Sequence, residues 1–329
     1  MKLIITGGSG FIGSALIRKV LKTTHHEVLN IDKLTYAANP RSLKEVEKNP
    51  RYSFLQADIC DIAAIQKAFN DFKPDAIFHL AAESHVDRSI SGSNEFINTN
   101  INGTHTLLSV AQQYWKKADA FSNFRFIHVS TDEVYGSLKE NDPKFSETTA
   151  YAPNSPYSAS KASSDHLARS WFKTYGLPTI ITHCSNNYGP WQNTEKLIPL
   201  MVSCAIQNKA LPVYGKGENI RDWIYVEDHV RGLLLTLKKG IPGKVYNMGG
   251  DSEIKNINLV KSICKILDKI HPRKDNKSYT EQIKYVEDRL GHDYRYAIDN
   301  THINKELDWH PVKIFEEGLL ETITWYLEG

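Results

Sequence analysis

Five side chains suited to proton transfer lie in two short stretches of the chain. In the first, HVSTDEVYG, the residues Thr131, Asp132 and Glu133 follow directly after an apolar segment. In the second, SPYSASK, Tyr157 and Lys161 are four positions apart, a spacing that stacks both on one face of a helix. A hydroxyl, two carboxylates, a phenol and an amine could together remove and deliver protons on one ligand.

The pair Tyr157 and Lys161 has the composition of a general base. A phenol titrates at about 10 in water, but an ammonium about 4 Å away contributes roughly 4 kcal/mol at an effective dielectric of about 20. Lys161 is therefore expected to lower the pKa of Tyr157 to about 7. The phenolate could then take a proton from a hydroxyl group of a ligand, and Thr131 could hydrogen-bond the same hydroxyl.

The apolar segment before Ser130 predicts a buried strand over 124–129. The polar residues that follow it would lie at the carboxyl end of that strand. Ligands bind at this end of the strands in open α/β sheets.

The N-terminus has the pattern of a cofactor loop. A strand predicted over 2–6 leads into GGSGFIG and then into a helix predicted over 14–21. Gly7, Gly10 and Gly13 fit G-x-x-G-x-x-G, and the run also fits G-x-G-x-x-G. Glycine lets the backbone turn tightly and approach a pyrophosphate, whose charge the helix N-terminus favours.

Acidic residues follow the next two predicted strands. The strand over 27–31 ends in Asp32, close to the spacing at which a carboxylate hydrogen-bonds the adenosine ribose. A carboxylate there would repel a 2′-phosphate, so NAD is favoured over NADP. Asp58 follows the third predicted strand and could contact adenine, although an N-cap for the helix beginning near Asp61 is a competing interpretation.

Strands and helices alternate through the first half of the chain. Further strands are predicted over 52–56, 76–80 and 179–183, and further helices over 62–72, 95–114 and 157–175. Repeated βα units of this length predict an α/β fold with a doubly wound parallel (Rossmann) sheet.

The alternation stops after His183, and this break predicts a division of the chain. Residues 1–183 are expected to form an NAD-binding Rossmann domain, to which segments at about 222–248 and 296–312 return. A strand and a helix over 222–237 and a strand over 245–248 are expected to join the main sheet. Residues 184–329 are expected to form mainly a smaller substrate-binding lobe.

Composition excludes several classes of partner. Lys and Arg total 40 against 38 Asp and Glu, so the formal net charge is +2 and neither nucleic acid nor membrane is an expected partner. The four cysteines lie far apart without a C-x-x-C pair, so neither a metal site nor a disulfide framework is expected. With no secretory signal and no long apolar run, a soluble, cytoplasmic protein is expected.

Several runs of the sequence carry a resemblance that covers nearly the whole chain: TGGSGFIGSAL, IDKLTYAAN, HLAAESHVDRSI, HVSTDEVYG, SPYSASKASSDHL, CSNNYGP, EKLIPL, GENIRDWIYVEDH and RYAID. With them the sequence resembles the extended short-chain dehydrogenase/reductase family and, within it, the dTDP-glucose 4,6-dehydratases. The resemblance implies a hydro-lyase with tightly bound, recycled NAD. It would oxidise C4 of the glucose, eliminate water across C5–C6 and return hydride to C6. It also implies a homodimer formed through helices 95–114 and 157–175, and a place in deoxysugar biosynthesis, such as that of dTDP-rhamnose.

The resemblance also implies roles for individual residues. Glu133 would remove the C5 proton that the C4 ketone makes acidic, and Asp132 would protonate the departing C6 hydroxyl, provided that their environments separate the two pKa values. Matching family positions imply NAD-binding by Gly7, Gly10, Phe11, Ile12, Gly13, Asp32, Lys33, Thr35, Asp58, Ile59, Ala81, Ser84, Thr99, Tyr157, Lys161 and Asn186. They imply substrate-binding by Ser84, Thr131, Asn187, Lys196, Leu197, Pro212, Tyr214, Arg221, Asn256, Arg289 and His292. The sequence departs from the family pattern at Leu290, where proline is usual, and at positions 193–194.

Two other functions stay open. A nucleotide-sugar 4-epimerase or a uronate decarboxylase of the same fold would not eliminate the C6 hydroxyl, so neither accounts for the adjacent Asp132 and Glu133. A non-catalytic NAD-binding sensor or scaffold would be indifferent to Tyr157→Phe and Glu133→Gln, whereas a dehydratase would lose most of its turnover.

Overall fold

The computed structural model describes residues 1–117 and 123–328, and its centre is a parallel sheet. Within these residues the sheet has seven strands in the order β10-β6-β5-β4-β1-β2-β3, and every pairing is parallel. The strands are β1 (Lys2–Thr6), β2 (Glu27–Asp32), β3 (Tyr52–Gln56), β4 (Ala76–His79), β5 (Arg125–Thr131), β6 (Thr179–Cys184) and β10 (Val245–Met248). The predicted doubly wound α/β fold is thereby confirmed.

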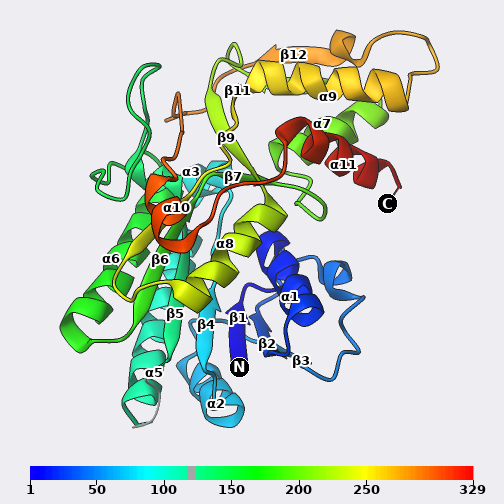
Figure 1. The fold of residues 1–329 in the computed structure, drawn as a ribbon. Helices are drawn as coiled ribbons and strands as arrows, with labels where there is room; N and C mark the ends of the chain where they lie inside the picture. The colour runs from blue at the N-terminus through cyan, green and yellow to red at the C-terminus, as the bar shows by residue number, and fades with distance from the viewer. Residues whose placement is uncertain (118–122, 329) are drawn as a thin grey trace.

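Helices cover both faces of this sheet (Figure 1). One face carries α1 (Phe11–Thr23), α8 (Val226–Lys239) and α10 (Thr301–Leu307), and the other carries α2 (Ile62–Phe72), α5 (Thr104–Lys117) and α6 (Pro156–Tyr175). Side chains alternate along β1, so Leu3 and Ile5 pack in the core beneath α1, whereas Ile4 packs in the core beneath α2 and α5. A strand buried on both faces in this way reads as a continuous apolar run.

A smaller lobe lies beyond the carboxyl ends of the sheet strands (Figure 1). Its strands are β7 (Asn186–Tyr188), β8 (Leu211–Tyr214), β9 (Ile220–Tyr225), β11 (Glu253–Lys255) and β12 (Ile283–Val286), and its helices are α7 (Leu197–Ile206), α9 (Asn256–Ile270) and α11 (Phe315–Glu328). The lobe has a core of its own, in which Ile198 and Val202 of α7 pack with Ile263 and Leu267 of α9. Other short helices are η1 (Pro40–Leu43), α3 (Val86–Ser91), α4 (Asn94–Phe96) and η4 (Tyr279–Gln282).

The strand expected to return to the main sheet within 222–237 does not do so. Strand β9 pairs with β7 and β11 in the small lobe, so this prediction is wrong. Its six residues are almost all buried, which identifies a strand but not its partner. Only the helix that follows, α8, lies on the main sheet, where it contacts α1, β5 and β6, while β10 pairs with β6 as expected.

Two element boundaries differ from the prediction near the site. Strand β5 extends two residues further than expected, through Thr131, and a single 3₁₀ turn, η3 (Asp132–Tyr135), follows it. The helix predicted over 95–114 contains a π-helical segment, η2 (Ile97–Gly103), between α4 and α5. No helix of the described residues is long and apolar enough to cross a membrane.

Candidate active site

The glycine loop between β1 and α1 is compressed against the end of β4. Gly7 has a φ of +70°, and a Cβ there would lie 2.7 Å from the backbone of Ala81. A Cβ at Gly13 would lie 2.3 Å from the carbonyl oxygen of Gly7. The loop therefore closes only with glycine at these positions, and it places bare backbone at the N-terminus of α1, where a pyrophosphate is favoured.

The carboxylate of Asp32 lies at the end of β2, directly beside this loop. It accepts hydrogen bonds from the backbone N–H of Ser9 at 2.9 Å and of Leu34 at 2.8 Å. Burial raises the pKa of Asp32, and the two N–H donors act in the opposite direction. Each carboxylate oxygen keeps a further lone pair, so the group could still accept from two ribose hydroxyls.

The competing interpretation of Asp58 is decided by the cap of α2. The side chain of Asp61 accepts from the N–H groups of Ala63 and Ala64, so Asp61 is the N-cap. Asp58 instead forms an ion pair with Lys33 at 2.7 Å. Both of these paired side chains line the cavity described next.

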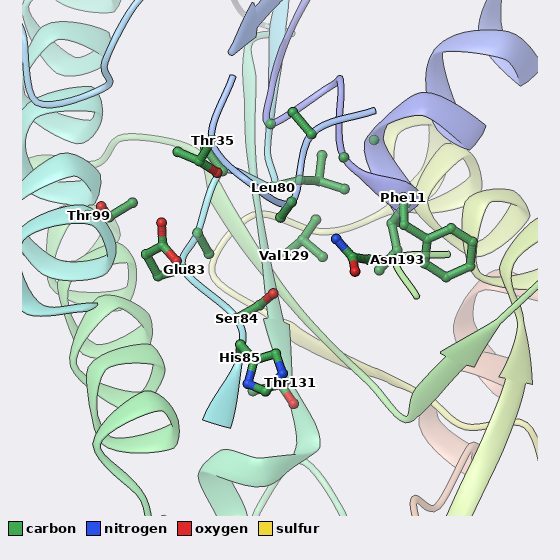
Figure 2. A pocket seen from close by; sticks show the side chains of 18 of the residues that line it. Phe11, Thr35, Leu80, Glu83, Ser84, His85, Thr99, Val129, Thr131 and Asn193 are labelled. Atoms are coloured by element: carbon green, nitrogen blue, oxygen red, sulfur yellow. The ribbon is translucent and has the colours of Figure 1, made fainter. Parts of the chain in front are cut away.

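A single cavity at the carboxyl ends of β1 to β5, here called the strand-end cavity, is shown in Figure 2. In the figure Phe11, Ser84 and Thr131 come from different segments and converge on it. Every residue proposed from the sequence to contact NAD lines it: Gly7, Gly10, Phe11, Ile12, Gly13, Asp32, Lys33, Thr35, Asp58, Ile59, Ala81, Ser84, Thr99, Tyr157, Lys161 and Asn186. The five predicted acid–base residues line the same cavity.

Three of these five residues lie at the point where β5 passes into η3. The Thr131 hydroxyl accepts from the Glu133 N–H at 3.3 Å and lies 3.4 Å from Asp132 Oδ1. Asp132 is 2% exposed, and its Oδ2 has no hydrogen-bond partner in the described chain. A buried carboxyl oxygen without a partner is costly, which is expected where a ligand supplies the missing partner.

The two neighbouring carboxyl groups have different electrostatic surroundings. Burial raises the pKa of Asp132 well above its usual value, and the carboxylates of Glu133 and Asp222 raise it further. Burial also raises the pKa of Glu133, but the charges of Lys196 and Arg221 oppose that rise. Asp132 is therefore the more readily protonated of the pair, and Glu133 the more readily ionised.

Tyr157 and Lys161 lie on the buried face of α6. This helix begins with Pro156 at its first position and with a capping box between Ser155 and Ser158. Lys161 Nζ donates to the Val129 carbonyl at 3.0 Å. The helix cap and this bond fix the pair against the end of β5.

The prediction that Lys161 alone brings the pKa of Tyr157 near neutrality is wrong. Burial and the Glu133 carboxylate raise the pKa of Tyr157 well above its usual value, while a hydrogen bond with Thr131 acts in the opposite direction. Burial also lowers the pKa of Lys161. The sequence-based calculation counted the attraction between the two groups but not the desolvation of either one.

A second cavity, here called the lobe cavity, opens from the first into the small lobe. Most predicted substrate-binding residues line it: Asn187, Lys196, Leu197, Pro212, Tyr214, Arg221, Asn256, Arg289 and His292. The other two, Ser84 and Thr131, line the strand-end cavity. Glu133, Asn187 and Lys196 line both, so the two cavities meet beside the acid–base residues.

Cationic and acidic side chains both line the lobe cavity: the cations are Lys196, Arg221 and Arg289, and the carboxyl groups are those of Asp87, Glu133, Glu195 and Asp293. Arg221 is 8% exposed, donates to the Asp293 carbonyl at 3.0 Å, and has its guanidinium 4.3 Å from the centre of the Tyr296 ring. Arg289 lies over Tyr214 at 5.3 Å. Contacts of this kind restrict where the two guanidinium groups lie, and a guanidinium fork suits phosphate oxygens.

Of the three positions that depart from the family pattern, only Asn193 lines a cavity. Leu290 is 78% exposed and lines neither cavity, although its neighbour Arg289 does. Asn193 lines the strand-end cavity, and its amide donates to the Tyr36 carbonyl at 3.5 Å. Thr194 lines neither cavity.

The sequence alone does not assign several lining residues to the site. His85 lines both cavities and could be a catalytic base, but a histidine in a loop is more often simply a hydrogen-bonded side chain. Tyr36 was missed as well: its ring lies 3.7 Å from the Arg88 guanidinium, which in turn bonds Glu195 at 2.6 Å. These contacts join residues far apart in the chain, so no local signal marks them.

The fold and site define an enzyme class, the extended short-chain dehydrogenases/reductases. The family model described as GDP-mannose 4,6 dehydratase matches residues 4–322, and the chain belongs to that family. A dTDP-glucose 4,6-dehydratase of Salmonella typhimurium is 57% identical over 337 residues, covering 99% of this chain and 93% of the relative.

Solved structures extend the comparison. The dTDP-glucose 4,6-dehydratase DesIV of Streptomyces venezuelae, crystallised with NAD and TYD bound, has a TM-score of 0.91 at 42% identity, covering 100% of this chain and 97% of its own. A UDP-glucuronic acid 4-epimerase of Bacillus cereus, in complex with UDP-glucuronic acid and NAD, has a TM-score of 0.88 at 26% identity, covering 100% and 99%. Overall shape is thus common to both activities, and the distinction between them lies in sequence and site.

Proposed function

We propose that the protein is a dTDP-glucose 4,6-dehydratase that carries out oxidation, elimination and reduction in one site with bound NAD. The observation that carries this proposal is the adjacent pair Asp132 and Glu133, with unequal electrostatic surroundings, at the junction of the two cavities. An epimerase or a decarboxylase needs no such pair, because neither expels the C6 hydroxyl.

Oxidation at C4 uses the residues around Tyr157. The Tyr157 phenolate accepts the C4 hydroxyl proton while Thr131, with which it is hydrogen-bonded, orients that hydroxyl. NAD, when bound, supplies the hydride acceptor and a positive ring that favours the phenolate. Lys161, fixed by the Val129 carbonyl, adds positive charge from the helix side.

Elimination uses the two carboxyl groups. The ketone at C4 makes the C5 proton acidic, and the Glu133 carboxylate removes it; burial raises the pKa of Glu133, and the charges of Lys196 and Arg221 oppose that rise. Asp132, held protonated by burial and by its neighbouring carboxylates, donates a proton to the departing C6 hydroxyl. The partnerless Oδ2 of Asp132 is suited to that contact.

The nucleotide occupies the lobe cavity in this proposal. Arg221 and Arg289 bind the diphosphate, and the lobe formed mainly by residues 184–329 is the substrate-binding part of the chain. Lys196 reaches the same cavity while donating to the Ser84 carbonyl at 3.1 Å. Asn256 Oδ1 is buried without a hydrogen-bond partner in the described residues, which suits an acceptor for a ligand N–H.

NAD occupies the strand-end cavity, with its pyrophosphate at the glycine loop and its adenosine ribose at Asp32. Retention through repeated turnovers is favoured because two lining residues from distant segments, Tyr36 and Glu195, are joined to each other by Arg88. The cofactor is therefore expected to remain bound and to be recycled.

We also propose a cytoplasmic homodimer. Its interface would be formed by the outer face of α6 and by the outer face of the continuous helical segment made of α4, η2 and α5. Ile97 and Tyr175 are 48% and 43% exposed on this side of the molecule. The His105 and Trp171 rings pack edge to face at 5.5 Å and bridge the two helices. Light scattering coupled to size exclusion tests this, and a monomer at micromolar concentration would contradict it.

The decisive experiment follows a deuterium label from C4 of dTDP-glucose. The dehydratase moves the label to C6 of the 4-keto-6-deoxy product without net formation of NADH. Formation of NADH in step with product, or retention of the C6 hydroxyl, would refute the proposal and favour a dehydrogenase or an epimerase activity. Parallel binding of dTDP-glucose and UDP-glucose then establishes which nucleotide is preferred.

A further inference from the structure

A buried carboxylate that lines neither cavity lies one helical turn beyond Lys161. Asp165 is 1% exposed. It accepts from His128 Nε2 and from His183 Nε2, each at 3.0 Å, and from the Tyr151 hydroxyl at 3.1 Å. Buried carboxylates are rare unless fully paired, and this one is held by partners from two strands and a loop.

A chain of contacts leads from Asp165 to the turn that carries the acidic pair. Because a carboxylate only accepts hydrogen bonds, it requires a proton on Nε2 of His183. The other ring nitrogen, Nδ1, meets the Tyr135 hydroxyl at 2.8 Å. Tyr135 is 3% exposed and is the last residue of η3, which begins at Asp132. The chain thus joins α6 to η3 through β6.

The same carboxylate faces the charge of Lys161. Burial lowers the pKa of Lys161, and the negative charge of Asp165 opposes that lowering. The two histidines hold the pKa of Asp165 far below its usual range despite burial. The buried face of α6 therefore carries the Asp165 carboxylate one turn after Lys161. This carboxylate is hydrogen-bonded to histidines of β5 and β6.

We propose that Asp165, His183 and Tyr135 form a positioning network that fixes η3 relative to α6, so that the elimination pair and the oxidation pair act on the same sugar ring. The inference rests on the proposed dehydratase function. None of the three residues lines either cavity, so they act through the catalytic residues and do not touch the ligand.

The first test is Tyr135→Phe in the NAD-loaded full-length enzyme. Loss of the hydroxyl removes the contact of η3 with His183, together with the bond that the hydroxyl donates to Asn247 Oδ1 at 3.0 Å, and leaves the contact of His183 with Asp165 of α6 in place. C4 oxidation is expected to continue while elimination slows roughly ten- to hundredfold, the loss expected when a catalytic group is misplaced. Bound NADH should then accumulate during turnover, with kcat lowered and KM for dTDP-glucose little changed.

The matched control is Tyr279→Phe. Tyr279 is also buried, and its hydroxyl also meets a histidine, His271 Nδ1 at 3.1 Å, but it lies in the core of the small lobe. It is expected to behave as wild type. Equal kcat and equal bound NADH in Tyr135→Phe and Tyr279→Phe would overturn the network.

The second test measures the network by NMR and does not depend on enzyme activity. In Asp165→Asn the carboxylate that requires the Nε2 proton is gone, so the side-chain 15N shifts of His183 are expected to move. Unchanged shifts would overturn the network. If the wild-type enzyme forms no 4-keto-6-deoxy product, the proposed function fails, and the His183 shifts still decide the network on their own.

Discussion

The two cavities that meet at Glu133 are built in opposite ways. The strand-end cavity is formed by loops at equivalent positions of successive βα units, and its carboxylates Asp32 and Asp58 are satisfied by backbone N–H groups or by Lys33. The lobe cavity draws on separated segments, and its cations include the buried Arg221. Under the proposed function, backbone shape would bind a phosphate in the first cavity, whereas side-chain charge would do so in the second. Glycines should then matter most in the first cavity and arginines in the second.

The largest expected effect on kcat comes from a substitution at Glu133, where the two cavities meet. In Glu133→Gln the base for the C5 proton is removed, so kcat should fall roughly 10²- to 10⁴-fold while C4 oxidation persists. Stopped-flow absorbance should show NADH that forms and is not consumed. Glu281→Gln, an exposed carboxylate of the small lobe, serves as the control. A normal turnover rate in Glu133→Gln would remove the basis for a dehydratase.

A smaller loss is expected when the lobe cavity alone is altered. Arg221→Lys removes the guanidinium fork, and a lost charged hydrogen bond of about 1.5–3 kcal/mol corresponds to roughly a ten- to hundredfold rise in KM. NAD content should be unchanged. Arg273→Lys is the control, because Arg273 pairs with Asp275 and lines neither cavity. If NAD content falls with Arg221→Lys, the two cavities are not separable in the way described.

The converse change is made in the strand-end cavity. In Gly13→Ala the new Cβ would collide with the Gly7 carbonyl oxygen at 2.3 Å, so the loop must open. NAD affinity should fall about tenfold, a loss of about 1.4 kcal/mol, while titration calorimetry with dTDP shows unchanged binding to the lobe. Gly92→Ala is matched, since its Cβ would meet only a carbonyl oxygen at 3.8 Å. Equal NAD affinity in the two variants would contradict the role of the loop.

The smallest effect concerns stability. The pKa of Asp132 is higher in the folded state than in the unfolded state. Between these two pKa values the folded protein binds more protons than the unfolded protein, so the stability falls as the pH rises through this range. Asp132→Asn removes this penalty and should stabilise the protein at neutral pH by about 1 kcal/mol, a typical size for one stabilising substitution. The gain should vanish below about pH 4, the unfolded pKa of Asp. Thermal melts at several pH values measure it, and a lower Tm at neutral pH would count against the raised pKa.

The sequence predicts the strand-end cavity well because its signals are local. Gly7, Gly10 and Gly13 lie within one turn, and Asp32 ends the next strand, so short patterns place them at one edge of a parallel sheet. The roles of the individual residues stay predictions. For the lobe cavity the positions came from resemblance alone, since Arg221 and Arg289 are brought together only by the fold.

Other features lay beyond sequence reasoning for physical reasons. The partner of β9 depends on tertiary pairing, which an apolar run does not encode. The raised pKa of Tyr157 depends on burial, which the Tyr–Lys spacing does not reveal. Asp165 lies four residues after Lys161, a spacing that could have marked it, but its histidine partners come from separate strands.

The π-helical segment η2 positions an amide that fixes one wall of the strand-end cavity. Asn100, within this segment, accepts from the Glu83 N–H at 2.9 Å and donates both to the Glu83 carbonyl at 3.0 Å and to Ser160 Oγ of α6 at 2.8 Å. Successive residues of an α-helix are rotated about the helix axis by about 100°, and the wider π-helical turn changes this rotation for the residues of η2. The Asn100 amide can therefore point at the loop after β4 while the apolar side of α5 stays on the sheet. Deleting a single residue from η2 would turn that amide away and free the loop that forms one wall of the strand-end cavity.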